Sequence, residues 1–250
     1  MIRSVRPVSV LLVFCIAISL LYGAAAAPAP AAASGPSPVQ RYAFDEGQGA
    51  SAVESVSGNA HAIAGTPVWV QGAVGQALDF DGQSTSIVMD AFDKTAFTMT
   101  AWIKPRSYTY NHFIVGQGVS GSQPHMFNWW VNGGKLYFLL SDGTGNGYGL
   151  WPFATADGSV PLNEWTHVAV SRSGNAFKLY VNGALAASKS ASGTIDASGN
   201  PNPLRIGAQN TSDGAPMGVF DGAIDEFAVY EEALSDAQIA AIAAGGGGPL

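Results

Sequence analysis

Alternating apolar and polar positions are clearest in the stretch from residue 163 to residue 189. Val168 and Val170 alternate there with the side chains between them, and after a short polar turn the alternation resumes over 177–181. A period of two is typical of β-strands and not of helices. Asn182-Gly183 then supplies the two positive φ angles of a tight hairpin turn, and the chain runs back as a third strand. This stretch predicts an antiparallel meander with one apolar face, which a second sheet must cover.

The same alternation recurs on both sides of this meander, interrupted by turns rich in Gly, Asn and Asp. We expect hairpins about Asp81-Gly82 and about Asn132-Gly133-Gly134. Ser235 and Gln238 have the spacing of a capping box, which predicts one short helix near the end of the chain. Further strands are expected at 39–44, 77–80, 86–89, 97–104, 113–116, 126–131, 135–140, 204–207 and 222–230.

The first 27 residues have the pattern of a secretory signal. Arg3 and Arg6 precede an apolar run over 8–21, and small residues follow at 23–27. We therefore predict a secreted protein, extracellular or periplasmic; an uncleaved membrane anchor is the alternative. The run is short for a membrane span, and no later stretch of the sequence is long enough for one. We expect a signal peptide at 1–27, an Ala/Pro-rich linker at 28–38, one domain at 39–243 and a Gly-rich tail at 244–250.

Composition narrows the range of partners. The chain carries 11 basic and 18 acidic residues, which gives a formal net charge of -7 at pH 7. An acidic balance argues against nucleic acid or an anionic membrane as a partner, and it fits neutral ligands or divalent cations. The one cysteine, Cys15, falls within the predicted signal. The mature chain is therefore expected to fold without a disulfide.

Six blocks of sequence stand out in order along the chain: Tyr42-Ala-Phe-Asp-Glu-Gly-Gln-Gly, Gly75-Gln-Ala-Leu-Asp-Phe-Asp-Gly, Phe97-Thr-Met-Thr-Ala-Trp-Ile-Lys-Pro, Trp165-Thr-His-Val-Ala, Leu179-Tyr-Val-Asn-Gly and Phe220-Asp-Gly-Ala-Ile-Asp-Glu-Phe-Ala-Val-Tyr. They resemble the blocks of the laminin G-like jelly-roll family, within the concanavalin A-like lectin and glucanase superfamily, over residues 39–243. The resemblance implies an all-β jelly-roll sandwich of two antiparallel sheets with one short C-terminal helix. It also implies a non-catalytic binding or accessory role in secreted proteins, although one fold carries many activities.

Three aspartates are candidate metal ligands. Asp225 is expected on the apolar side of the last strand, together with Phe227 and Val229. A carboxylate in an apolar row is unfavourable unless it is paired, hydrogen-bonded or bound to a cation. The first and last strands are neighbours in a jelly roll of this kind, so Asp45 can approach Asp225, and Asp81 is a third candidate. Such oxygen ligands suit a structural Ca²⁺, and relatives of the family are similar in holding one near the terminal strands. The alternative is that each aspartate accepts backbone N–H groups in its own turn.

The pattern of acidic residues does not indicate catalysis. Glucanases of this superfamily need two nearby carboxylates on one strand, and no Glu-x-Asp-x-Glu run occurs. Glu54 and Glu226 belong to a group of glutamates expected at strand or loop ends, mostly solvated. Gln123-Pro124-His125 is similar to an element of some jelly-roll alginate lyases, but the partner motifs are absent. We therefore expect a protein that is not an enzyme.

Two adjacent tryptophans indicate a candidate ligand site. In the strand at 126–131, Trp129 shares one face with Phe127, and Trp130 shares the other face with Asn128. Both rings cannot enter the same core, so one lies on an outer sheet face, where a ring beside an amide suits a sugar. We choose Trp130 with Asn128; the alternative is that Trp130 packs beneath the loop at 141–151. Loop residues that could border the site are Tyr108, Tyr110, His125, Tyr148 and Trp151.

Three functions are compatible with this sequence. We predict non-catalytic binding of carbohydrate or of a glycosylated surface, with a structural calcium. A protein-interaction or adhesion module is the alternative, and a divergent glycoside hydrolase or polysaccharide lyase is the third hypothesis. Exposed Trp and Tyr side chains beside Asn or Asp would favour sugar, and a broad apolar patch would favour protein. Two carboxylates about 5–10 Å apart in a groove would indicate an enzyme.

Overall fold

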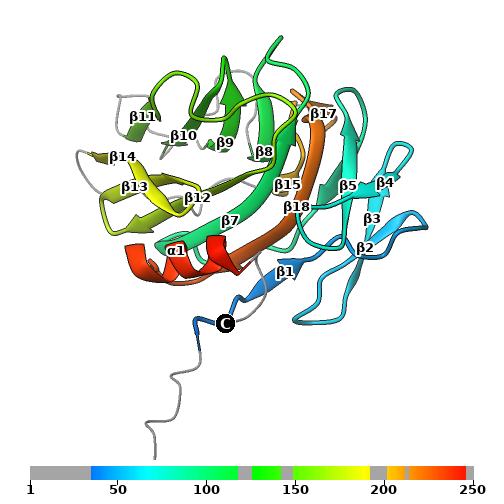
Figure 1. Ribbon diagram of the computed structural model, residues 1–250, viewed down its shortest axis with the longest axis horizontal. Coiled ribbons are helices and arrows are strands. Elements are labelled where there is room, and N and C mark those ends of the chain that lie inside the picture. Colours follow the sequence, from blue (N-terminus) through cyan, green and yellow to red (C-terminus); the bar gives the residue numbers. More distant parts are fainter. Residues whose placement is uncertain (1–34, 118–125, 142–148, 192–201, 212–213, 246–250) are drawn as a thin grey trace, which may run out of the picture. The chain divides into compact units, whose positions relative to one another are not determined.

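Two large antiparallel β-sheets dominate the structure (Figure 1). All described residues belong to one compact unit, Ser34–Leu250. The predicted all-β sandwich of two antiparallel sheets with one short helix is confirmed. The computed structural model describes residues 35–117, 126–141, 149–191, 202–211 and 214–245, with the backbone alone at 149–151.

We call the first of these sheets sheet 1. The first and last strands, β1 (Gln40–Tyr42) and β18 (Asp221–Tyr230), pair in it as neighbours. The predicted meander is confirmed as β12, β13 and β14 in succession. From edge to edge, sheet 1 contains β14 (Ala184–Ser190), β13 (Ala176–Val181), β12 (Thr166–Ser173), β7 (Ala96–Pro105), β18, β5 (Gln76–Asp81) and β4 (Val68–Gln71), with β1 beside β18.

Sheet 2 also contains eight strands. The predicted hairpin about Asn132-Gly133-Gly134 is confirmed, since Asn132 lies opposite Lys135 at the end of the β9–β10 ladder. A separate two-stranded hairpin, β16 (Gln209–Asn210) with β17 (Pro216–Met217), completes the strands. From edge to edge, sheet 2 contains β11 (Gly149–Ala154), β10 (Lys135–Ser141), β9 (Phe127–Asn132), β8 (His112–Gly116), β15 (Arg205–Ile206), β6 (Ser86–Val88), β3 (Ala60–Ala64) and β2 (Ser51–Val53).

The hydrophobic core lies between the inner faces of the two sheets. Phe97 and Met99 of β7 and Phe127 and Trp129 of β9 are all buried in it. The rings of Phe97 and Phe127 join the sheets, with centroids 5.4 Å apart. Because strand residues alternate between faces, the period of two in the sequence is the pattern of this core.

One short helix, α1 (Asp236–Ala244), covers part of the outer face of sheet 1. The predicted capping box is confirmed: the Ser235 hydroxyl accepts a hydrogen bond from the Gln238 backbone N–H, and the Gln238 side chain accepts one from the Ser235 backbone N–H. The helix thereby begins at a fixed residue and can present one face to the sheet. Its buried residues, Ile239 and Ile242, pack with Ala169, Tyr180, Ala228, Tyr230 and Leu234.

A bulge in β18 changes which side of sheet 1 its residues face. Glu226 has a φ of 48°, and the register with β7 shifts by one residue just after Asp225. Asp225 therefore lies opposite Trp102 on the outer face, whereas Phe227 is part of the core. The prediction that Asp225 shares a face with Phe227 and Val229 is wrong, because the extra residue inverts the alternation.

The prediction of a hairpin about Asp81-Gly82 is also wrong. β5 belongs to sheet 1 and β6 to sheet 2, so this turn carries the chain from one sheet to the other. The Asp81 carboxylate accepts hydrogen bonds from the backbone N–H groups of Gln83 and Thr85, both at 2.9 Å. These bonds fold the chain into a corner and direct it away from its own sheet.

The ends of the chain are described only in part. Among the described residues, no helix combines the length and the apolar character needed to cross a membrane. The predicted signal at 1–27 and most of the predicted linker and tail lie outside the described residues. They stay predictions.

Candidate functional site

The alternation of β9 places two tryptophans on opposite sides of sheet 2. Trp129 is fully buried between the sheets, whereas Trp130 lies on the outer face with its side chain 8% exposed. This is the facing that the sequence predicts. Trp130 belongs to a separate apolar cluster with Phe113 and Leu139, on which Met126 and Tyr137 also pack.

Aromatic rings form a row across three neighbouring strands of this outer face. Phe113 of β8 and Tyr137 of β10 are the cross-strand partners of Trp130. The ring of Trp130 stacks on that of Tyr137 with centroids 5.1 Å apart and an angle of 10° between the planes. The ring of Phe113 lies 5.9 Å away on the other side. Such pairs hold one another in place, so the row forms a rigid floor.

A groove runs over this floor as two adjoining pockets of about 410 and 200 Å³. The two pockets share Asn111, Phe113 and Gln209, which makes the groove continuous. Gly218, with a φ of 60°, lets the β16–β17 hairpin approach Phe113 closely, because a Cβ there would lie 2.5 Å from the ring. The other lining residues are Gly82, Gln83, Tyr110, His112, Met126, Asn128, Trp130, Leu139, Pro216, Met217 and Val219.

The side chain of Asn128 is the unusual group in this groove. It is 6% exposed, and its Oδ1 has no hydrogen-bond partner among the residues that the structure describes. A buried amide oxygen without a partner costs about 1–3 kcal/mol of folding free energy. The neighbouring amides are satisfied differently, since Asn132 donates to the Asn111 side chain at 2.8 Å. Asn128 thus brings to the groove wall an acceptor that no described residue uses.

The predicted metal ligands Asp45 and Asp225 meet around the loop that joins β4 to β5. Asp225 Oδ2 accepts a hydrogen bond from the Val74 backbone N–H at 2.9 Å, and Asp45 Oδ1 accepts one from the Gln76 N–H at 2.8 Å. Asp225 is fully buried, and its Oδ1 has no partner among the described residues. Burial raises the pKa of Asp225 to about 7, and the nearby Glu226 and Asp45 act in the same direction.

Asp81 is not part of this group. It lies at the opposite end of β5, where its carboxylate also accepts hydrogen bonds from the Ser84 backbone N–H and hydroxyl, both at 2.7 Å. Burial opposes its ionisation, but these hydrogen bonds hold the pKa of Asp81 well below its usual range. Asp81 thus acts in its own turn, the alternative that the sequence left open. Among the described residues, no three His, Cys, Asp or Glu side chains cluster in a way that could hold a metal ion.

Two glutamates that the sequence predicts in a mostly solvated group, Glu54 and Glu226, are instead buried. Glu226 accepts hydrogen bonds from the Arg41 guanidinium at 2.8 and 2.9 Å. Glu54 Oε1 accepts hydrogen bonds from the backbone N–H groups of Arg41 and Val56, at 2.9 and 2.7 Å. Both carboxylates are thus occupied in holding β1 and the turn after β2 in place.

A laminin G family model matches residues 79–240, well over half of the chain, and its description is the concanavalin A-like lectin/glucanases superfamily. The chain belongs to this superfamily. The resemblance that the sequence blocks indicate is thereby confirmed. A comparison with curated protein sequences gave no match.

Solved structures of similar fold include several binding domains of larger proteins. Domain 4 of AbnA, a GH43 extracellular arabinanase from Geobacillus stearothermophilus in complex with arabinotriose, is 21% identical with a TM-score of 0.61, covering 84% of this chain and 99% of that chain. The CBM40 domain of the Ruminococcus gnavus IT-sialidase, bound to α2,3 sialyllactose, is 21% identical with a TM-score of 0.52, covering 60% and 83%. The receptor-binding domain of botulinum neurotoxin type G is 11% identical with a TM-score of 0.60, covering 83% and 51%. At these identities the likeness shows the fold alone.

Within this superfamily fold, the other predicted ligand residues lie in different places. Tyr110 lines the groove and is 75% exposed. Tyr108 is not among the residues that line the groove, because its ring packs against the core and its hydroxyl donates to the Val160 carbonyl. His125 and Tyr148 lie outside the described residues, and so does the side chain of Trp151.

Sequence reasoning missed Phe113, His112 and Gln209 as groove residues. A register shift between Phe113 and Val115 turns Phe113 to the outer face, and a period-two pattern does not show such a shift. Gln209 comes from β16, far along the chain from Asn128, so only the fold brings the two residues together. His112 is fixed by contacts of its Nδ1 with the Val219 carbonyl and of its Nε2 with the Ser107 hydroxyl, both at 3.2 Å.

Proposed function

We propose that this protein is a non-catalytic carbohydrate-binding module and that the groove on the outer face of sheet 2 holds the sugar. The observation that carries this proposal is the buried, unpartnered amide oxygen of Asn128 beside the ring of Trp130. A sugar hydroxyl would supply the missing hydrogen bond, and C–H groups of the sugar would contact the aromatic floor. Two proteins of similar fold bind arabinotriose and sialyllactose, which supports the same class of ligand.

The chemistry of the groove supports binding over catalysis. Glycoside hydrolysis needs, in most families, two carboxylates on either side of the scissile bond. Among the described residues that line the two pockets, none is Asp or Glu. The polar groups there are amides, a phenol and the His112 imidazole, whose two nitrogens contact the Val219 carbonyl and the Ser107 hydroxyl, and such groups can hydrogen-bond to sugar hydroxyls. A neutral sugar is accordingly the ligand of this groove.

A single substitution separates this function from folding. Asn128→Leu removes the unpartnered amide, so the free energy of unfolding should stay the same or rise, whereas glycan binding should be lost. The measurements are a glycan array of the mature protein, followed by isothermal titration of the strongest glycan against wild type and variant. Asn59→Leu, the same change in the exposed segment before β3, is the control and should bind as wild type does. Undiminished binding by Asn128→Leu would remove the groove from the proposal.

A structural calcium beside Asp225 is a second part of the proposal. The buried Oδ1 of Asp225, which has no partner among the described residues, supports this part of the proposal, and so does Asp45, which accepts a hydrogen bond from the Gln76 N–H. Asp225, Asp45 and backbone carbonyls of the 72–75 loop would hold the ion, since calcium accepts carboxylate and carbonyl oxygens. Bound calcium would neutralise the buried charge of Asp225 and tie β18 to the β4–β5 loop.

Thermal unfolding with calcium and with chelator tests this second part. Calcium at a hundredfold excess over its dissociation constant would stabilise the fold by about 2.7 kcal/mol, so chelator should lower the melting temperature. Asp225→Asn should abolish this response. Asp81→Asn should destabilise the corner between the sheets but keep the response, because Asp81 is at the other end of β5. A wild-type protein that melts identically in both buffers would exclude the site.

We also propose that residues 1–27 direct export and are then removed. The basic start, the apolar run and the small residues that follow support this. Mass spectrometry of the exported protein should give a mature N-terminus close to residue 28. Recovery of the full-length chain in the membrane fraction would instead support an uncleaved anchor.

A further inference from the structure

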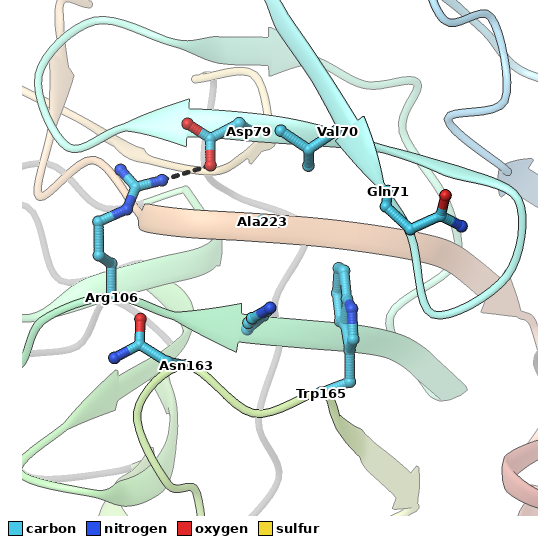
Figure 2. Close-up of a pocket in the computed structure, with 8 residues that line it drawn as sticks. Val70, Gln71, Asp79, Arg106, Asn163, Trp165 and Ala223 are labelled. Atoms are coloured by element: carbon cyan, nitrogen blue, oxygen red, sulfur yellow. Dashed lines mark hydrogen bonds and ion pairs between the residues drawn. The ribbon is translucent and has the colours of Figure 1, made fainter.

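A second pocket, of about 360 Å³, lies on the outer face of sheet 1. It has a simple cause in the strand register: Ala223 of β18 lies opposite Asp79 of β5 on one side and opposite Lys104 of β7 on the other. The methyl group of Ala223 is short, so it leaves a hollow between two longer side chains. Figure 2 shows Val70, Gln71 and Asp79 on one side of the Ala223 strand and Asn163 and Trp165 on the other.

The charged side chains of this pocket are not all engaged in ion pairs. Arg106 forms ion pairs with Asp79 (dashed in Figure 2) and with Asp221, so its charge is matched. The side chain of Lys104 has no ion pair and no hydrogen bond with any residue that the structure describes. In contrast, Lys135 and Lys178 each pair with an aspartate. The two aspartates and the two cations balance in number, but the Lys104 ammonium group lines the pocket without an ion pair among the described residues.

The remaining groups of this pocket suit a sugar ring. Trp165 is half-buried and supplies an aromatic surface at one side. Gln71 donates its Nε2–H to the Gly75 carbonyl at 2.8 Å, which fixes the amide and leaves its oxygen to accept. Asn163 is held at a φ of 59°, with its backbone N–H bonded to the Pro105 carbonyl at 2.8 Å. A half-buried indole ring, one fixed amide, the Asn163 side chain on a fixed backbone and the Lys104 ammonium group therefore line the same hollow.

We propose that this pocket binds an acidic sugar unit, a hexuronate, with its carboxylate on Lys104 and its ring against Trp165. The hydroxyls of the sugar would meet the side chains of Gln71 and Asn163. A phosphate fits less well, because the Arg106 guanidinium, which could bind it with two hydrogen bonds, is already paired with Asp79 and Asp221. A pocket of this size accommodates one sugar ring. The site is independent of the groove on sheet 2, which carries no lysine or arginine among its described lining residues.

Nuclear magnetic resonance titration of the mature protein tests the proposal, with D-glucuronate as probe and D-glucose as its neutral counterpart. The chain has 6 tryptophans, and Trp165→Phe identifies the indole signal of Trp165. We expect D-glucuronate to shift this signal and D-glucose to leave it unmoved at the same concentration. Lys104→Gln should weaken D-glucuronate about tenfold or more, the effect of losing a hydrogen bond between charged groups. Added salt should weaken it as well.

Lys135→Gln is the matched control, because it removes the same charge from sheet 2 and should not change D-glucuronate binding. Asn128→Leu should also leave the Trp165 shift intact, so failure of the groove and failure of this pocket give different results. A Lys104→Gln variant that binds D-glucuronate as tightly as wild type would overturn the proposal. So would equal shifts by D-glucose, which would make this a neutral sugar site, or a shift confined to Trp130.

Discussion

The outer faces of the two sheets each carry a buried oxygen that has no partner among the described residues, and the two oxygens are of different kinds. On sheet 1 it is Oδ1 of Asp225, enclosed beside the β4–β5 loop. On sheet 2 it is Oδ1 of Asn128, in the wall of an open groove. An isolated buried carboxylate must be protonated or bound to a cation, whereas an amide needs only a hydroxyl. A buried oxygen without a partner therefore predicts a cation beside Asp225 and a hydroxyl group beside Asn128.

The two outer faces are also covered by different elements. On sheet 1 the helix α1 packs over Ala169, Tyr180 and Ala228, which leaves Asp225 and the Ala223 hollow beyond the covered part. On sheet 2 the aromatic row packs on itself, and the small β16–β17 hairpin closes one side of the groove. One face is thus covered in part by a helix, and the other carries a groove over rings and amides.

The largest effect is expected where neither outer face is involved. Trp129→Ala empties a fully buried site between the sheets and should lower the free energy of unfolding by about 3–5 kcal/mol. Urea unfolding followed by circular dichroism measures it. A loss below about 1 kcal/mol would mean that Trp129 does not belong to the core, and the assignment of inner and outer faces would have to be exchanged.

The next largest effect is the pH dependence of the free energy of unfolding, which should involve Asp225 and not Asn128. Burial raises the pKa of Asp225 to about 7, so the folded protein holds a proton there that the unfolded chain releases near pH 4. Stability from this group is complete below about pH 4 and is lost as the pH rises through 7. In chelator, wild type should lose on the order of 2–4 kcal/mol relative to Asp225→Asn between about pH 4 and pH 8.

Urea titrations at each pH measure this difference. His167, whose pKa burial lowers to about 4, contributes the opposite slope to both proteins, so the comparison isolates Asp225. Parallel pH profiles would show that Asp225 keeps an ordinary pKa. Asn128→Leu, which changes no ionisable group, should follow wild type throughout.

A smaller loss is expected from the outer tryptophan. Trp130→Ala removes the stack on Tyr137, but the space opens into the groove and water can enter it. The free energy of unfolding should fall by about 1–3 kcal/mol, between a core site and a surface site. The same urea series gives the value. Equal losses from Trp129→Ala and Trp130→Ala would mean that the outer ring is part of a closed core, and the groove would lose its floor.

The smallest effect concerns the helix that covers sheet 1. Ser235→Ala removes the cap of α1 and should cost about 1 kcal/mol, and Ser235→Asp should retain most of the stability. Thermal unfolding measures both variants. Sugar binding to sheet 2 should be unchanged, because the helix packs on the other sheet. A change in glycan affinity would show that the two faces are coupled.

Local sequence patterns predict the strands, the helix cap and the opposite facing of Trp129 and Trp130, since each depends on neighbours in the chain. The side of Asp225 could not be predicted in the same way. It depends on a bulge of one extra residue, with Glu226 in a left-handed conformation. A period-two pattern assumes a strand without bulges. The sequence around Asp81 predicts a hairpin. The Asp81 carboxylate instead accepts hydrogen bonds that turn the chain toward the other sheet.

The candidate sites depend still more on the fold. Asn128 and Trp130 could be predicted because they are two residues apart on one strand. The pocket around Ala223 could not, because Asp79, Lys104 and Ala223 come from three strands that only the pairing of β5, β18 and β7 brings together. Distance along the chain, and not the residue types, decides which part of a site a single sequence can reveal.

The pairing of β1 with β18 has a mechanical consequence. Gln40 lies opposite Val229 and Tyr42 opposite Phe227, so the chain enters and leaves this pair at the same end. A force applied between residues 39 and 230 would therefore load the hydrogen bonds between β1 and β18 one after another. The first to be loaded is the bond from the Val39 N–H to the Val229 carbonyl. Peeling β1 in this way would draw Asp45 away from Asp225 while the rest of the sandwich stays folded. Tension along the chain would therefore reach the neighbourhood of the buried carboxylate only after the β1–β18 hydrogen bonds have opened.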